Sequence, residues 1–94
     1  MKLTAKVADD QAFYVYDGPK INSVSELMES IESDAISDSS FSYHINNDND
    51  FIKWIMDVYQ HEQLGKSLKR VKTKKTFLKK LKEQMTANGK KSRV

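Results

Sequence analysis

The sequence predicts a small α+β domain in which three to four helices pack on a short two-stranded β element, followed by a basic C-terminal helix and a flexible tail. Three observations predict this class: two segments with apolar residues at helical spacing, two short segments with strand-like patterns, and a lysine-rich end. The length of 94 residues provides for one modest core. We expect an acidic globular α/β domain over residues 1–72 and the basic helix with its tail over residues 73–94.

Two short strands are expected, at residues 13–16 and 41–45. In the first, four β-forming residues precede Asp17-Gly18-Pro19, a sequence typical of a turn. In the second, Phe41, Tyr43 and Ile45 alternate with polar residues, which is the pattern of a half-buried strand.

The first helix is expected over residues 24–33. Ser23 stands three residues before Glu26, the spacing of a capping box, in which the hydroxyl accepts from the N–H of Glu26 and the carboxylate accepts from the N–H of Ser23. The apolar stripe behind this cap consists of Val24, Leu27, Met28 and Ile31.

The second helix follows the polar run at residues 46–50, whose short side chains can cap its first turn. Its apolar stripe has the same spacing and consists of Phe51, Trp54, Ile55 and Val58. Because this is the most apolar segment of the chain, we expect it at the centre of the core.

Two further helices are expected, at residues 62–71 and at residues 74–86, the latter capped by Thr73. Gly65 lowers the intrinsic helix propensity of the first by about 1 kcal/mol relative to alanine. The last helix has a narrow apolar stripe, and lysines occupy the rest of its circumference. Residues 87–94 have no apolar periodicity and are expected to be flexible.

Several of these positions form ordered motifs: F-x-x-x-x-G at residues 13–18, S-x-x-E-L at residues 23–27, Y-H at residues 43–44 and D-F-x-x-W-I at residues 50–55. Together they resemble a small domain family of unknown function found mainly in prokaryotes, and the likeness covers about residues 13–68. The resemblance implies a small α/β domain and no particular activity, since that family has no assigned chemistry. The lysine-rich end lies beyond the matched part.

Charge is distributed very unevenly along the chain. Up to Glu62 there are twelve acidic residues and four lysines, whereas from Gln63 onward there are twelve basic residues and a single acid, Glu83. A net charge of −8 therefore precedes a net charge of +11. An acidic domain with a basic arm favours binding to polyanions or to acidic surfaces.

We therefore predict a non-enzymatic protein that binds nucleic acid, either DNA or RNA, through phosphate contacts with little sequence specificity. After Glu62 lysines outnumber arginines ten to two. Lysine lacks the planar pair of donors with which arginine forms bidentate hydrogen bonds to guanine, so little sequence specificity is expected. The cations expected to contact phosphates are Lys66, Lys69, Arg70, Lys72, Lys74, Lys75, Lys79, Lys80 and Lys82. Two alternatives stay open. One is a protein-interaction or self-assembling module whose basic helix docks on an acidic surface. The other is an anionic membrane surface, which the narrow apolar stripe disfavours.

His44 and the polar run after it have structural explanations. A hydrogen bond from the His44 imidazole to Asp50 or to the helix cap would hold the predicted strand to the following helix, and ligand binding or pH sensing are the alternatives. Asn46, Asp48 and Asp50 fall at positions 1, 3 and 5 of a calcium-loop template, but Phe51 stands where that loop needs glycine. Helix capping explains these residues more simply, so neither a metal nor a cofactor is expected.

The nine aromatic side chains could include a stacking platform for nucleobases. Most of them fall on predicted apolar faces, so a place in the core explains them more simply. Tyr14 and Tyr16 share one face of the first predicted strand and are the expected exceptions.

Catalytic residues are not predicted, because the sequence has no glycine-rich phosphate loop, zinc pattern or nucleophile-base set at a recognisable spacing. The absence of cysteine excludes disulfides and thiolate metal sites. Neither a signal-peptide pattern nor a transmembrane segment of about 18 apolar residues is recognised. We expect a soluble cytoplasmic protein, associated with the nucleoid if DNA is its partner.

Overall fold

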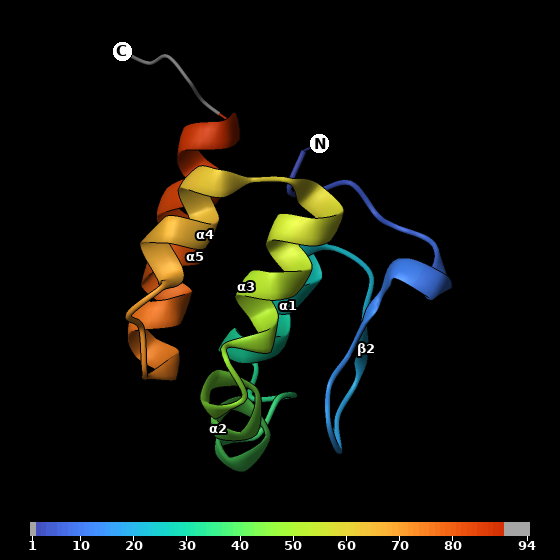
Figure 1. The fold of residues 1–94 in the computed structure, drawn as a ribbon, viewed down its shortest axis with the longest axis vertical. Helices are drawn as coiled ribbons and strands as arrows, with labels where there is room; N and C mark the ends of the chain where they lie inside the picture. The colour runs from blue at the N-terminus through green and yellow to red at the C-terminus, as the bar shows by residue number, and fades with distance from the viewer. Residues whose placement is uncertain (1, 90–94) are drawn as a thin grey trace.

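The computed structural model describes residues 2–89, and in this part of the chain five α-helices gather beside a two-stranded antiparallel hairpin (Figure 1). The hairpin and the pair α4–α5 lie on opposite sides of α1 and α3 in this view. The elements are η1 (a 3-10 turn, Asp9–Gln11), β1 (Phe13–Tyr14), β2 (Lys20–Ile21), α1 (Val24–Glu32), α2 (Asp38–Asn46), α3 (Asp50–Trp54), η2 (a π-helical turn, Ile55–Tyr59), α4 (Glu62–Leu68) and α5 (Lys74–Gly89). The predicted α+β class is confirmed.

The hairpin contains the first predicted strand, but its partner is not the segment that the sequence analysis predicted. Phe13 pairs with Ile21 and Tyr14 with Lys20, across the predicted turn at residues 17–19. Val15 is buried between the exposed Tyr14 and Tyr16, so the alternation extends beyond the two paired residues.

The prediction of a strand at residues 41–45 is wrong, because these residues lie within α2. Ser37 caps this helix, since its hydroxyl accepts from the N–H of Ser40 at 3.1 Å. Phe41, His44 and Ile45 are buried and stand at i, i+3 and i+4, the spacing of one helix face. Tyr43 is exposed. The segment is short enough to fit both periods, and the cap together with the burial of His44 selects the helix.

The capping box predicted at the start of α1 forms with one difference. The Ser23 hydroxyl accepts from the N–H of Glu26 at 3.0 Å, as expected. The Glu26 carboxylate, however, accepts from the N–H of Asn22 at 2.8 Å, one residue earlier than predicted. Glu26 therefore fixes the connection between β2 and α1.

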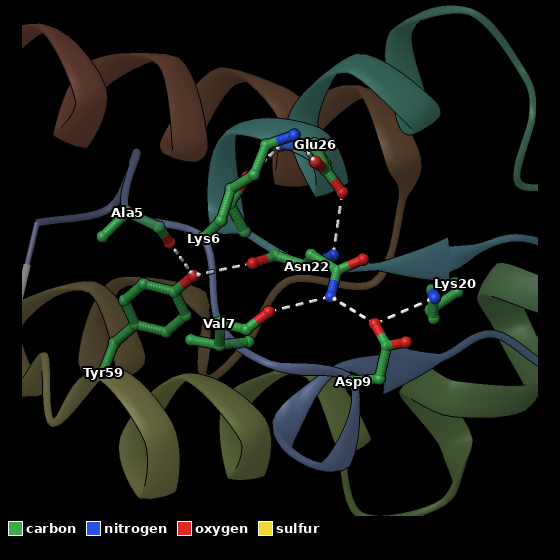
Figure 2. Close-up of polar contacts among 9 residues, drawn as sticks. Ala5, Lys6, Val7, Asp9, Lys20, Asn22, Glu26 and Tyr59 are labelled. Carbon is green, nitrogen blue, oxygen red and sulfur yellow. Dashed lines mark hydrogen bonds and ion pairs between the residues drawn. The ribbon is translucent and has the colours of Figure 1, made fainter.

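The Asn22 side chain and the Tyr59 hydroxyl tie the N-terminal segment to the rest of the fold (Figure 2). The Asn22 amide donates to the carbonyl of Val7 at 2.9 Å and to the carboxylate of Asp9 at 3.2 Å. The Tyr59 hydroxyl donates to the carbonyl of Ala5 at 2.6 Å. Burial raises the pKa of Tyr59 above its ordinary value of 10.0, so this donor keeps its proton at neutral pH.

The second predicted helix is at the centre of the core, but its last turn is π-helical. Asn49 caps α3 from a left-handed conformation, with φ of 50°, by accepting from the N–H of Ile52 at 3.2 Å. Hydrogen bonds in a π-helix span five residues rather than four, which brings Tyr59, five residues after Trp54, onto the buried face. Val58, which the regular period predicted for the core, is only partly buried.

The basic helix α5 belongs to the same core as the acidic part of the chain. Phe77 and Leu81 are fully buried, and the Phe77 ring lies 5.3 Å from that of Phe41 and 5.2 Å from that of Phe51 between centroids. The helix continues to Gly89, three residues beyond its predicted end at residue 86. The rest of the predicted flexible tail, residues 90–94, lies outside the described residues.

Candidate polyanion-binding site

Lys74, one of the nine predicted phosphate-contacting cations, is held by oxygen atoms of its own chain. Its ammonium lies 2.8 Å from the carboxylate of Asp34 and 3.2 Å from that of Asp38, and it donates to the carbonyl of Ile36 at 2.7 Å. The Lys74 side chain is only 15% exposed. It therefore fastens the first residue of α5 to the connection between α1 and α2.

The charge of Lys74 is stabilised in this position. Burial alone would lower the pKa of Lys74, but the hydrogen bonds to Asp34 and Asp38 outweigh it and raise the pKa above the ordinary value of 10.5. The ammonium therefore stays charged at neutral pH.

Lys82 is the second candidate that is paired within the chain. Its ammonium lies 2.9 Å from the carboxylate of Glu32 on α1, and both side chains are about half exposed. An exposed pair of this kind contributes about 0–1 kcal/mol, so Lys82 can exchange Glu32 for another anion at little cost. Together, Lys74 and Lys82 hold the basic helix on acidic residues of the same chain.

Five of the nine candidates line one open groove between α4 and α5, which pack side by side (Figure 1). We call it the basic groove; its volume is about 540 Å³. Its cations are Lys66, Lys69, Arg70, Lys72 and Lys80, and its hydroxyl groups come from Ser67, Thr73 and Thr76. Among the described residues that line it, none is acidic. Lys75 and Lys79 are exposed on α5 and are not among the lining residues.

A second groove of about 530 Å³ adjoins the basic groove on the side of α2 and α3. We call it the apolar groove, and its apolar lining residues are Ile45, Ile52, Met56 and Val71. Lys66, Lys69, Val71 and Lys72 line both grooves. The two grooves therefore meet along the connection from α4 to α5.

The sequence analysis did not identify the apolar groove, although one signal of it was visible. Gly65 interrupts an otherwise regular helix, and a β-carbon at this position would lie 2.5 Å from the sulfur of Met56. Glycine at residue 65 thus lets the Met56 side chain lie against α4 at the groove. The sequence indicated a break in helix propensity there, but only the packing of η2 against α4 shows its reason.

His44 forms the predicted hydrogen bond with Asp50, although it does so from a helix. Its Nε2 accepts from the backbone N–H of Tyr16 at 2.9 Å, so Nδ1 carries the hydrogen and donates to Oδ2 of Asp50 at 2.7 Å. The His44 side chain is 7% exposed. Burial alone would raise the pKa of Asp50, but the hydrogen bonds from His44 and Asn47 lower it below its ordinary value of 3.8. His44 thus joins the hairpin, α2 and α3.

The exposed aromatic side chains include the two that the sequence analysis predicted. Tyr14 and Tyr16 are 59% and 60% exposed, and Tyr43 of α2 is 50% exposed. Tyr16 and Tyr43 stack on each other with centroids 4.6 Å apart and an angle of 25° between the rings. Half or more of each tyrosine in this pair is exposed to solvent.

Neither a family model, nor a curated protein, nor a solved structure matches the chain. Over the part of the chain that the structure describes, no helix is long and apolar enough to cross a membrane. The same residues contain no group of three or more acidic, histidine or cysteine side chains placed to hold a metal ion.

Proposed function

We propose that this protein binds nucleic acid through phosphate contacts in the basic groove. The observation that carries the proposal is the convergence of five cationic side chains from α4, α5 and their connection on one groove that no described acid lines. The hydroxyls of Ser67, Thr73 and Thr76 add neutral hydrogen-bond donors of the kind that contact phosphate oxygens. Such contacts position a nucleic acid backbone without reading its sequence.

The nine predicted cations have different roles in the proposed complex. The five that line the basic groove contact phosphates directly. Lys75, Lys79 and Lys82 contribute to the surrounding positive field, and Lys74 holds the fold together. The three ion pairs of Lys74 and Lys82 with acidic residues reduce the charge of α5 that a ligand meets, so the groove, rather than the helix as a whole, is the proposed site.

The test is a titration of a fluorescent oligonucleotide at several salt concentrations, followed by anisotropy. Each phosphate contact on duplex DNA contributes a slope of about −0.9 to a plot of log K against log salt, and about −0.7 on a single strand. The triple variant Lys66→Gln, Lys69→Gln, Lys72→Gln should flatten that slope by about 2–3 units.

Lys75→Gln with Lys79→Gln is the matched control, because both lysines are exposed on α5 outside the groove. This double variant should flatten the slope by less than one unit. Equal effects of the two sets of substitutions would show that binding depends on the overall charge and not on the groove. A wild-type protein that binds no nucleic acid at low salt would refute the proposal.

Interaction with a protein is the second candidate function, and the exposed tyrosines favour it. Three tyrosines, Tyr14, Tyr16 and Tyr43, are exposed on the surface, and tyrosine is a residue type enriched in protein interfaces. If the protein acts through these tyrosines, Tyr43→Ala should weaken self-association or partner binding without changing the salt slope for nucleic acid. Analytical ultracentrifugation of the wild type and the variant over a range of concentrations tests self-association.

A further inference from the structure

We propose that the nucleic acid is single-stranded, with an unpaired base in the apolar groove while its phosphates lie along the basic groove. This inference rests on the proposed function and names the class of ligand for the same site. The inference assigns a ligand to the apolar groove, whereas phosphate contacts alone would involve only the basic groove.

The junction between the two grooves supports this arrangement. Lys66, Lys69 and Lys72 line both grooves, so a phosphate held by these lysines has the hydroxyl-lined groove on one side and the apolar groove on the other. In a single strand the sugar places each base to one side of its phosphate. A backbone along the lysines can therefore direct a base into the apolar groove.

The apolar groove suits the face of a base. Ile52 and Met56 are partly buried and partly exposed there, so a flat apolar surface that covers them removes both from water. A volume of about 530 Å³ lies within the range of about 300–1,000 Å³ that is usual for small-ligand sites. Bases in an intact duplex are paired and stacked inside the helix, and their faces cannot enter.

Polar side chains on the α2 side of the apolar groove suit the edge of a base. Asn46 is the last residue of α2 and is exposed, and its amide offers both donors and an acceptor. Asp48 lines the same side and places a negative charge there. That carboxylate disfavours a second carboxylate, which argues for a base rather than an acidic peptide as the occupant.

Tyr43, which stacks on Tyr16, lines neither groove but neighbours Asn46 on α2. Tyr43 lies three residues before Asn46 on α2, and residues at this spacing are neighbours on a helix surface. Bases stack on exposed aromatic rings in many single-strand binding proteins, and this stacking tolerates any base. In the proposed complex the base that follows the one in the apolar groove stacks on the exposed part of the Tyr43 ring.

The experiment compares three labelled probes of equal length by anisotropy at one low salt concentration: an oligothymidylate, an abasic oligomer with the same phosphates, and a duplex. The wild type should bind the oligothymidylate about ten-fold or more tightly than the abasic oligomer, and more tightly than the duplex. Met56→Ala, Asn46→Ala and Tyr43→Ala should each reduce the ratio of the first two affinities while leaving that for the abasic oligomer unchanged. Met28→Ala, a partly buried methionine on α1 away from both grooves, is the matched control and should leave the ratio unchanged.

The outcomes distinguish failure of the single-strand inference from failure of the proposed function. Equal affinities for the oligothymidylate and the abasic oligomer, or for the single strand and the duplex, would overturn the single-strand inference while leaving phosphate binding in place. No binding of any of the three probes would refute the proposed function itself. If polyglutamate competes as well as unlabelled oligothymidylate at equal charge concentration, the bases add nothing to binding and the inference is overturned.

Discussion

Nδ1 of His44 lies 2.7 Å from Oδ2 of Asp50, and the same imidazole accepts the backbone N–H of Tyr16 on its opposite nitrogen. One buried side chain thus connects three elements: the hairpin, α2 and α3. The Phe13 ring also packs against this imidazole with centroids 4.8 Å apart. His44 is therefore a structural residue of the core, which leads to the first prediction.

His44→Ala should lower the free energy of unfolding by about 2–4 kcal/mol, because it leaves the N–H of Tyr16 and the carboxylate of Asp50 without a partner and opens a cavity beside Phe13. Urea unfolding followed by Trp54 fluorescence measures the change. The folded variant should bind nucleic acid as the wild type does, since His44 lines neither groove. Full stability with lost binding would show instead that His44 belongs to a ligand site.

Trp54→Ala should cost about 3–5 kcal/mol, enough to threaten the fold of so small a domain. The ring is 8% exposed and packs edge-on against Phe13 and Tyr59, and its N–H donates to the carbonyl of Gln11 at 2.7 Å. Trp54→Phe keeps most of the ring contacts and loses the hydrogen bond, so it should cost only about 1–2 kcal/mol. Circular dichroism during thermal unfolding compares the two variants. Equal melting temperatures for the wild type and Trp54→Ala would contradict the central position of this side chain.

Acid should destabilise the protein partly through Asp50. The folded state lowers the pKa of Asp50, so its contribution to stability is present above the ordinary value of 3.8 and is lost as the pH falls through the lower value of the folded protein. Asp50→Asn should therefore unfold with a weaker pH dependence below about pH 4 than the wild type. Urea midpoints over a series of acidic buffers measure the slope. Asp48→Asn, at an exposed neighbouring position, is the control and should keep the wild-type slope.

Lys74 should behave as a structural cation and not as a phosphate ligand. Lys74→Met removes charged hydrogen bonds to Asp34, Asp38 and the carbonyl of Ile36, and should destabilise the protein at neutral pH by about 1–3 kcal/mol. The folded state raises the pKa of Lys74 above 10.5. The advantage of the wild type is therefore complete below that value and is lost as the pH rises through the raised pKa.

The same variant separates the roles of neighbouring lysines in binding. Lys74→Met should leave the salt dependence of nucleic acid binding unchanged, whereas Lys72→Gln, two residues earlier and in the basic groove, should flatten it by nearly one unit. A Lys74 variant with wild-type stability and a flattened salt slope would place Lys74 in the binding site and contradict its structural role.

The sequence alone determined the helices that have clear start signals and one regular apolar face. Ser23 with Glu26 marked the start of α1, and Thr73 marked that of α5, because a cap acts on the N–H groups of residues within one turn. The turn at residues 17–19 and the exposure of Tyr14 and Tyr16 also followed from local pattern. The separation of acidic and basic charge was likewise a property of the chain itself.

Tertiary structure decided everything that depends on contacts between distant segments. Residues 41–45 fit a strand and a helix equally well, and the burial of His44 against the hairpin selected the helix. Packing also decided the π-helical turn that buries Tyr59. The Tyr59 hydroxyl donates to the carbonyl of Ala5, which is 54 residues away in the chain.

The sequence shows where the lysines are, but it did not show which anion each ammonium group contacts in the folded protein. Lys74 and Lys82 face carboxylates 40 and 50 residues away in the chain, whereas Lys66, Lys69 and Lys72 meet at the junction of two grooves. Local patterns determine secondary structure because hydrogen bonds and caps act within a few residues. The groove depends on how α4 and α5 pack, and that packing is set by the whole core.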